Sequence, residues 1–274
     1  MDGEWLLRIE DIDAPREKAG AGDAIIRTLE SFGFQWDGAI SYQSQRSEHY
    51  LEALESLSEK GLLYPCACSR KEISKASKLG IYPGTCRDGL PDGRPARSWR
   101  VLMSSGAIAF NDAVQGPCHF DNDREIGDFI LKRADGLFAY QLAVAVDDTL
   151  QGITQVVRGS DLLDSTPRQI YLQQVLGHPH PEYAHHPVVI DEHGAKLSKQ
   201  QRAPALNATS DKQQILTDLY QALGLLGQMP PKDLLNTDPD SLWQWAFKNW
   251  SLAKIPAQNA IRTEEFAHTS DIEG

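Results

Sequence analysis

In the N-terminal part of the chain, the apolar positions form one strand-like run and two stretches with helical spacing. The run predicts a strand over residues 5–9, and a loop leads from it to a helix over roughly 21–33. A second amphipathic helix is expected from about Ser47 to Lys60, and Gly61 is well placed to end it. The first helix is predicted from the spacing of Ile25, Ile26, Leu29 and Phe32, and the second from that of Tyr50, Leu51, Leu54 and Leu57.

The periodicity is lost over residues 64–100, which are rich in Cys, Gly, Pro and basic side chains. Such a composition predicts a loop-dominated insertion that needs additional stabilisation, which a bound metal ion would supply. Beyond it, short apolar segments predict strands at "WRVLM", "FILKR" and "FAYQLAVAVDD", the last of them apolar enough to be buried on both faces.

The remainder alternates between helix and strand patterns. "TPRQIYLQQVLG" predicts a helix and "PVVID" a short strand, and residues 211–250 carry helical spacing again. Mixed elements of this kind predict an α/β nucleotide-binding core with an insertion and a helical tail. We expect four parts: 1–62 and 101–206 in the core, 63–100 as the insertion, and 207–274 as the helical region.

Composition is consistent with this organisation. The 274 residues are 41% hydrophobic and 24% charged, which allows a sizeable core. No window approaches 18 consecutive apolar residues and no secretory signal is visible, so a cytoplasmic protein without a membrane partner is expected. Nothing indicates an extensive apolar interface, and a monomer is the default.

The net charge of -11 argues against indiscriminate binding of nucleic acid. The insertion reverses this sign locally, because residues 69–100 hold eight basic and three acidic side chains. A polyanion could dock there, and a solvated loop with surplus basic residues is the alternative.

Three of the four cysteines, Cys66, Cys68 and Cys86, fall close together while Cys118 stands apart. This spacing suits a metal site in a reducing compartment better than a disulfide framework. Structural zinc takes four ligands, and Cys118, His119 or Tyr82 could be the fourth. Spacing alone does not choose among them, and three buried cysteines without a metal are the other possibility.

Two polar motifs are candidates for the chemistry. In "GAKLSKQ", Lys196 and Lys199 flank a serine in a loop after a strand, and their point charges suit phosphate oxygens, although an exposed basic turn is the ordinary reading. In "RIEDID", Glu10 follows a strand and could present a carboxylate at the ligand-binding edge of a parallel sheet, although acidic loops usually lie on the surface.

These motifs resemble signatures of class I aminoacyl-tRNA synthetases. "GAKLSKQ" is similar to their second signature, which implies that Lys199 binds ATP and is catalytic, with Lys196 in support. "RIEDID" is similar to the "RIEDTD" of glutamyl-tRNA synthetases, followed by matching "FAYQ" and "VVRGSD" segments. By this resemblance the residues that bind glutamate are Glu10, Tyr140 and Arg158. Taken singly, Tyr140 could instead be a core tyrosine with a satisfied hydroxyl, and Arg158 could be part of a surface ion pair.

The cysteine segment extends the resemblance to the glutamyl-queuosine tRNA(Asp) synthetases, short paralogues of the glutamyl-tRNA synthetase catalytic core. That family carries C-x-C and Y-x-x-x-C with tyrosine as a zinc ligand, which implies structural Zn²⁺ on Cys66, Cys68, Tyr82 and Cys86. It also implies a Rossmann-type parallel sheet, the use of magnesium and ATP, activation of L-glutamate, and transfer of the glutamate to queuosine at the wobble position of tRNA(Asp).

One family feature has no counterpart in the sequence. The first ATP-binding signature, with its strand and helix, normally precedes the "RIED" strand, and without it two neighbouring strands would carry unpaired backbone. We therefore expect the natural protein to start upstream of Met1. One alternative is a non-catalytic remnant that binds zinc, glutamate or tRNA. The other is a fragment of an ordinary glutamyl-tRNA synthetase, but the 75 residues after Lys199 are too few for the anticodon-binding domain of that enzyme.

Overall fold

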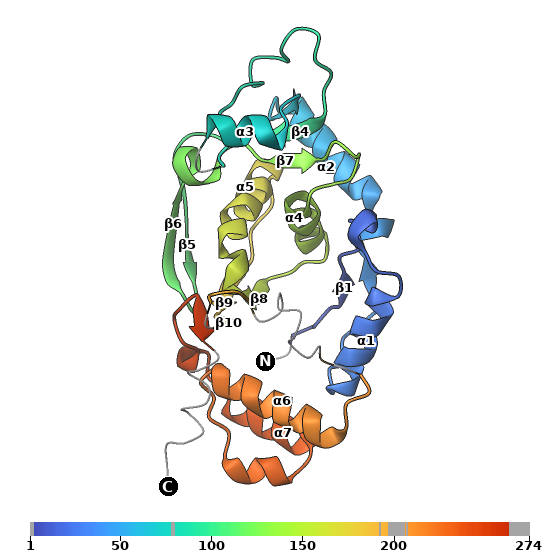
Figure 1. Ribbon diagram of the computed structural model, residues 1–274, viewed down its shortest axis with the longest axis vertical. Helices are drawn as coiled ribbons and strands as arrows, with labels where there is room; N and C mark the ends of the chain where they lie inside the picture. The colour runs from blue at the N-terminus through green and yellow to red at the C-terminus, as the bar shows by residue number, and fades with distance from the viewer. Residues whose placement is uncertain (1–2, 78–79, 192, 197–205, 207, 263–274) are drawn as a thin grey trace.

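The computed structural model describes residues 3–77, 80–191, 193–196, 206 and 208–262. It is a mixed α/β structure in which several short sheets, most with parallel strand pairs, surround two central helices (Figure 1). No helix in the described ranges is both long and apolar enough to cross a bilayer.

The N-terminal elements follow the predicted order. β1 (Arg8–Ile9) pairs in parallel with β2 (Ser41–Tyr42), so the predicted strand is shorter than the apolar run. Helices α1 (Ala21–Ser31) and α2 (Ser47–Glu59) lie where helical spacing placed them. In α2, Tyr50, Leu54 and Leu57 are buried, whereas Leu51 is 42% exposed and does not belong to the buried face. Gly61 takes a φ of 68°, which only glycine adopts easily, and it lies just beyond the helix.

The insertion contains more regular structure than its composition suggested. β3 (Leu63–Cys66), β4 (Ser98–Val101) and β7 (Ile130–Lys132) form an antiparallel sheet in the order β3-β4-β7. Helix α3 (Arg70–Ala76) starts with a capping box in which Ser69 and Glu72 satisfy each other's backbone N–H groups. This sheet connects the insertion directly to the core.

The largest sheet has the order β6-β5-β9-β8, built from β5 (Ala107–Asp112), β6 (Gly116–Asp121), β8 (Gln155–Gly159) and β9 (Glu182–His186). β8 and β9 are parallel, with Arg158 opposite His185, and β5 also pairs in parallel with β9. Three adjacent strands therefore end close to one another, which places Asp112, His185 and Arg158 side by side.

The prediction of a strand over "FAYQLAVAVDD" was wrong. The segment forms helix α4 (Tyr140–Leu150), which is buried all along residues 142–148. A continuous apolar run does not distinguish a buried strand from a helix that is buried on all sides, and this run is long enough for three helical turns. Helix α4 packs against α5 (Thr166–Leu176), the helix predicted at "TPRQIYLQQVLG", in the centre of the molecule (Figure 1).

The C-terminal part is helical as predicted, with α6 (Lys212–Leu225) and α7 (Pro239–Asn249) packed together. Its aromatic side chains also contact the N-terminal part, because Trp243 Nε1 donates to the carbonyl oxygen of Phe32 over 2.9 Å. The predicted strand at "PVVID" is β10 (Val188–Ile190), and β11 (Ala260–Arg262), which the sequence did not indicate, pairs with it in parallel.

Candidate functional site

Arg158 lies at the end of β8 and is held by buried side chains. Its Nε donates to His185 Nε2 over 3.0 Å, and its Nη2 donates to Thr166 Oγ1 and to Gln169 Oε1, both over 2.8 Å. The Tyr183 ring lies 5.5 Å from the guanidinium carbon. Sheet and helix α5 therefore fix the Arg158 side chain in one orientation.

Glu10 occupies the loop after β1 and lines a cavity of about 280 Å³ between β1 and the start of α1. Its side chain is 41% exposed, yet desolvation inside this hollow raises the pKa of Glu10, while the nearby Arg8 guanidinium opposes the rise. Arg158 also acts on the Glu10 carboxylate electrostatically. Glu10 and Arg158 are therefore close enough for their charges to interact.

The other charged residues of "RIEDID" bind the protein itself. Arg8 donates to Asp148 Oδ1 over 2.6 Å, and Asp11 accepts from the backbone N–H and the hydroxyl of Ser44 over 2.8 and 2.6 Å. Asp13 pairs with Arg133 over 3.0 Å. Sequence reasoning named only Glu10 from this motif and did not anticipate that its neighbours anchor the loop.

Tyr140 is the first residue of α4, at the helix end that faces Arg158 and Glu10. Burial raises the pKa of the Tyr140 hydroxyl, and the Glu10 carboxylate raises it further, whereas Arg158 and the Gln169 amide lower it. The three residues that the resemblance assigned to glutamate are therefore near enough for the charges of Glu10 and Arg158 to act on Tyr140. Tyr140 lies on a helix, not on the strand that we expected.

One buried polar atom beside this group has no hydrogen-bond partner among the described residues. It is the hydroxyl oxygen of Tyr183, a side chain of which 3% is exposed. Buried polar groups are nearly always paired in folded proteins, so this hydroxyl indicates room for a polar ligand. Tyr183 was not named from the sequence, because an isolated Tyr in a strand carries no recognisable signal.

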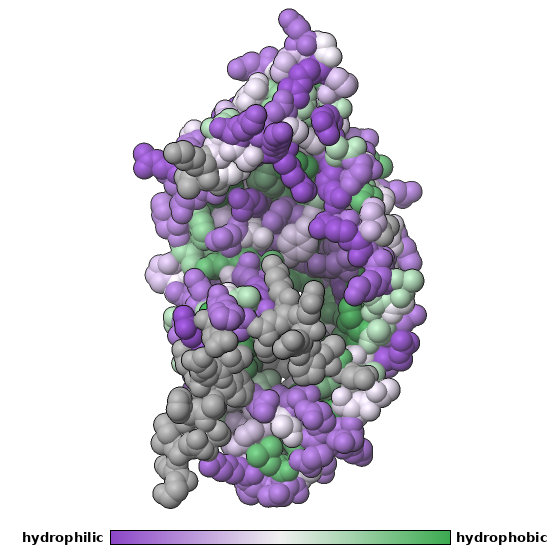
Figure 2. All heavy atoms as spheres, viewed as in Figure 1, coloured by the Kyte–Doolittle hydropathy of each residue, from purple (hydrophilic) through white to green (hydrophobic). Residues whose placement is uncertain are grey.

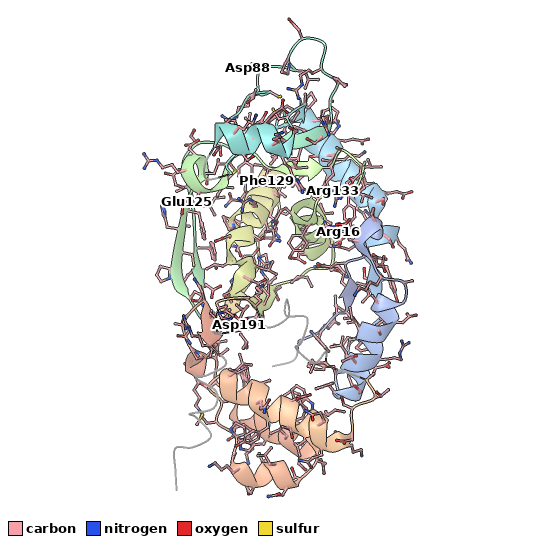
Figure 3. All side chains as sticks on the ribbon, in the orientation of Figure 1. Arg16, Asp88, Glu125, Phe129, Arg133 and Asp191 are labelled. Atoms are coloured by element: carbon pink, nitrogen blue, oxygen red, sulfur yellow. The ribbon has the colours of Figure 1, made fainter. Side chains whose placement is uncertain are left out.

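The lysine motif is described only in part. Lys196 follows the turn after β10 and forms an ion pair with Asp161, and Asp191 shapes that turn by accepting from the backbone N–H groups of His193 and Ala195 over 2.9 and 2.7 Å (Figure 3). Lys199 lies outside the described residues. The structure thus places the first lysine of the motif beside the segment that follows Arg158.

Cys66, Cys68 and Cys86 form one cluster, with their sulfur atoms within 4.8 Å of one another. The Tyr82 hydroxyl oxygen lies 3.4 Å from Cys66 Sγ and 3.7 Å from Cys68 Sγ, and the Cys68 and Cys86 sulfurs are 3.7 Å apart. Among the described residues Cys118 and His119 do not join this cluster.

These separations can be compared with those of a zinc site. Zinc binds sulfur at about 2.3 Å and oxygen at about 2.0 Å, so a tetrahedron has edges of about 3.8 Å between sulfurs and about 3.5 Å between sulfur and oxygen. The separation of the Cys68 and Cys86 sulfurs and the two distances to the Tyr82 oxygen match these edges, and the remaining sulfur separations are at most 4.8 Å. Although burial raises the pKa of the Cys66 thiol, contacts with Tyr82 and Arg100 outweigh it and lower that pKa to about 7, which favours the metal-binding thiolate.

A buried network fixes this cluster to the core. Asp128 accepts from Arg87 Nε and Nη2 over 2.6 and 2.8 Å, from the backbone N–H of Met103 over 2.8 Å, and from the Tyr64 hydroxyl. Arg100 donates to the backbone oxygen of Asp128 over 2.9 Å, and its guanidinium carbon lies 4.0 Å from the centre of the Tyr82 ring.

The network reduces the number of basic side chains in the insertion that are available to bind a partner. Arg87 and Arg100 are committed to it, and Arg94 pairs with Glu72 over 2.9 Å. Arg87 is still 39% exposed, and the other exposed basic side chains of the insertion, among those described, are Arg70, Lys71, Lys75 and Arg97. Figure 2 shows a largely hydrophilic surface over this part of the molecule.

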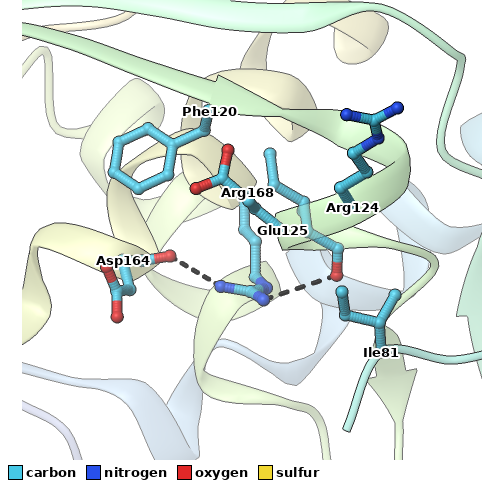
Figure 4. Close-up of a pocket in the computed structure, with 7 residues that line it drawn as sticks. Ile81, Phe120, Arg124, Glu125, Asp164 and Arg168 are labelled. Atoms are coloured by element: carbon cyan, nitrogen blue, oxygen red, sulfur yellow. Dashed lines mark hydrogen bonds between the residues drawn. The ribbon is translucent and has the colours of Figure 1, made fainter. Parts of the chain in front are cut away.

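A second cavity, of about 380 Å³, lies between the insertion, the turn after β6 and the start of α5 (Figure 4). Arg168 crosses it and donates to the backbone oxygens of Asp164 and Ile126 over 2.6 and 3.4 Å. Both hydrogen bonds tie chain segments together, and burial lowers the pKa of Arg168. Its lining also includes Arg124 and Glu125, so the charges balance and no ligand class is favoured.

Comparison with known proteins gives consistent results. A family model described as tRNA synthetases class I (E and Q), catalytic domain, matches residues 1–83 and 93–236. A protein of Dechloromonas aromatica named glutamyl-Q tRNA(Asp) synthetase is 52% identical over 265 residues, which cover 94% of this chain and 87% of that protein. A protein of Chromobacterium violaceum with the same name is 51% identical over 259 residues, with 93% and 85% covered.

Solved structures agree on the fold. The glutamate-tRNA synthetase of Elizabethkingia anophelis superimposes with a TM-score of 0.75 at 22% identity. The match covers 98% of this chain and 64% of that one.

Proposed function

Because this chain belongs to the class I tRNA synthetase family, among the glutamyl-Q tRNA(Asp) synthetases, and is an enzyme that acts on tRNA, we propose that it activates glutamate with ATP and transfers it to queuosine in tRNA(Asp). The glutamate carboxylate attacks the α-phosphate of ATP and pyrophosphate leaves. A hydroxyl of the queuosine ring then attacks the acyl carbon of the adenylate and AMP leaves.

The observation that carries the proposal is the convergence of Glu10, Tyr140 and Arg158. Glutamate presents an ammonium group and two carboxylates, so its site needs one anion and at least one cation within a few ångströms. Glu10 and Arg158 act on each other electrostatically across this space. The unpartnered hydroxyl of Tyr183 adds a polar contact for a small, multiply charged ligand.

For the nucleotide we assign Lys199 to the phosphates of magnesium-bound ATP, with Lys196 in support. A flexible ammonium group stabilises the charge that develops as pyrophosphate leaves, and it is worth most where water is excluded. The ion pair between Lys196 and Asp161 supports this assignment, because it holds the start of the lysine loop next to the strand that carries Arg158.

We assign structural zinc to Cys66, Cys68, Tyr82 and Cys86. The separations of these four groups support it, as does the backbone N–H of Cys86, which donates to the Tyr82 oxygen over 2.8 Å and so orients it. The ion stabilises the insertion. The exposed side chains of Arg70, Lys71, Lys75 and Arg97 then form a basic surface suited to tRNA phosphates.

Two alternatives are less well supported. A remnant that binds glutamate or tRNA without chemistry would have no use for the second lysine signature, which is intact in the sequence. A catalytic core of an ordinary glutamyl-tRNA synthetase is disfavoured because the relatives that are 51–52% identical carry the glutamyl-Q tRNA(Asp) name.

Activation can be tested alone by glutamate-dependent exchange of labelled pyrophosphate into ATP, with no tRNA present. Exchange with L-glutamate and far less with L-aspartate or L-glutamine is expected, because aspartate is shorter by one methylene group and glutamine lacks the second carboxylate. A preparation that retains its fold and zinc but exchanges nothing would refute the proposed activation.

A further inference from the structure

Arg158 is the last member of a buried chain of charged and polar groups that crosses three strands. Asp112 at the end of β5 contacts His185 on β9, with 2.6 Å between Asp112 Oδ2 and His185 Nδ1. His185 Nε2 in turn accepts from Arg158 Nε over 3.0 Å. His185 and Asp112 are 0% and 1% exposed, so neither meets solvent or a ligand directly.

The direction of these hydrogen bonds fixes the protonation of the imidazole. An arginine Nε is always a donor, so His185 Nε2 must offer its lone pair. The imidazole is therefore neutral and carries its proton on Nδ1, which donates to Asp112. Asp112 is itself held as a carboxylate by the backbone N–H groups of Val114, Gln115 and His185, over 3.0, 2.9 and 3.0 Å.

The same contacts decide which part of Arg158 remains available. Nε is taken by His185, and both hydrogens of Nη2 are taken by Thr166 and Gln169. Within the described chain nothing accepts from Nη1. A substrate carboxylate would therefore meet Nη1 alone, and a contact with two nitrogens of Arg158 is not open to it.

We propose that His185 and Asp112 are positioning residues for substrate binding, which turn Arg158 so that Nη1 faces the carboxylate of the amino acid. This rests on the proposed function, in which Arg158 binds glutamate. A lysine or a freely rotating arginine at this place would reach the carboxylate only part of the time. The buried pair removes that freedom before the substrate arrives, which is the usual origin of tight binding by a preorganised site.

Two substitutions of His185 separate positioning from packing. In His185→Asn the amide nitrogen can replace Nδ1 and still donate to Asp112, but nothing replaces Nε2 as acceptor for Arg158. In His185→Gln the longer side chain places its oxygen near the Nε2 position and can accept from Arg158. His186→Asn is the matched control, since His186 is the next residue on β9 and its side chain hydrogen-bonds, within the part of the chain that the structure describes, only to the backbone oxygen of Pro187.

The measurement is calorimetric titration of the full chain with L-glutamate, with thermal unfolding of each variant recorded alongside. Loss of one hydrogen bond to a charged group is expected to raise the Kd of H185N roughly tenfold or more. H185Q should recover most of the affinity, and H186N should bind like the wild type.

Analogues make the test specific to the carboxylate. L-Glutamine and the α-amide of glutamic acid each lack one carboxylate, and the H185N penalty should vanish for the one whose missing carboxylate Arg158 would hold. A wild type that binds glutamate and an H185N that binds it equally well would overturn the positioning role alone. A folded wild type that binds no glutamate would refute the proposed amino-acid site, and the positioning role would fall with it.

Discussion

The buried carboxylate of Asp147 is expected to hold residues 43–50 and, through them, the loop of Glu10 in place, and Asp147→Asn tests this. Asp147 lies in α4 with 0% of its side chain exposed. Its Oδ1 accepts from Arg46 Nε over 2.6 Å, and its Oδ2 accepts from Gln43 Nε2 over 2.9 Å and from the Tyr50 hydroxyl over 2.7 Å. It thereby ties residues 43–50 to the helix that starts at Tyr140.

The magnitude follows from what an amide can replace. Its oxygen can keep the contacts with Gln43 and Tyr50, but its NH₂ group would face the Arg46 donor, so the ion pair is lost. Breaking a fully buried pair costs about 3–5 kcal/mol. Arg46 is 21% exposed and can turn toward water, so we expect about 2–4 kcal/mol, or about 4–12 °C in Tm.

The assay is thermal and urea unfolding of the two proteins, with Asp135→Asn as the matched control. Asp135 also pairs with an arginine, Arg133, over 2.5 Å, but its side chain is 43% exposed and the pair should be worth about 0–1 kcal/mol. Glutamate affinity should fall in D147N as well, because β2 and the loop of Glu10 depend on residues 43–50. A D147N protein as stable as D135N would refute the reasoning.

Three further predictions concern the metal, the pH dependence and the lysine loop. Elemental analysis of the purified protein should find stoichiometric zinc. The Cys86→Ser variant should lose the zinc and the Cys118→Ser variant should keep it. A wild-type protein without zinc, whose thiols titrate freely, would contradict the zinc site. Burial lowers the pKa of His185 in the folded protein; Asp112 opposes this shift and Arg158 adds to it. The neutral imidazole therefore contributes fully to folding stability above the ordinary histidine pKa of 6.5, and this contribution is lost as the pH falls through the lower pKa of the folded state. The urea midpoint should therefore drop between about pH 7 and about pH 5, and less so in His185→Gln; a flat profile in both would exclude a buried neutral imidazole. Lys199→Ala should slow adenylate formation by orders of magnitude without changing Tm, and unchanged pyrophosphate exchange would remove Lys199 from its role.

The amphipathic helices could be predicted from the sequence because one face of each is polar. Helix α2 is the clearest example, with Tyr50, Leu54 and Leu57 buried at helical spacing. Helix α4 could not be predicted by the same signal, since its residues 142–148 are all buried and leave no polar face. Its two consecutive carboxylates, Asp147 and Asp148, read as the end of a strand until their partners Arg46 and Arg8 are seen.

The site was predictable only where a motif marks it. Glu10, Tyr140 and Arg158 were named from their resemblance to a family, and in the structure the charges of Glu10 and Arg158 both act on Tyr140. Asp112 and His185 were not named, because they come from distant strands and only the sheet register places them beside Arg158. The basic insertion shows the reverse error, since counting charges did not reveal that Arg87 and Arg100 are used internally.

The central claim is tested most directly by transfer of labelled L-glutamate, with ATP, to tRNA(Asp) that carries queuosine at the wobble position. The same tRNA with guanine at that position and a queuosine tRNA without its 3′-terminal adenosine serve as comparisons. The account predicts label on both queuosine tRNAs and none on the guanine form. Label that requires the 3′ adenosine and ignores queuosine would contradict it.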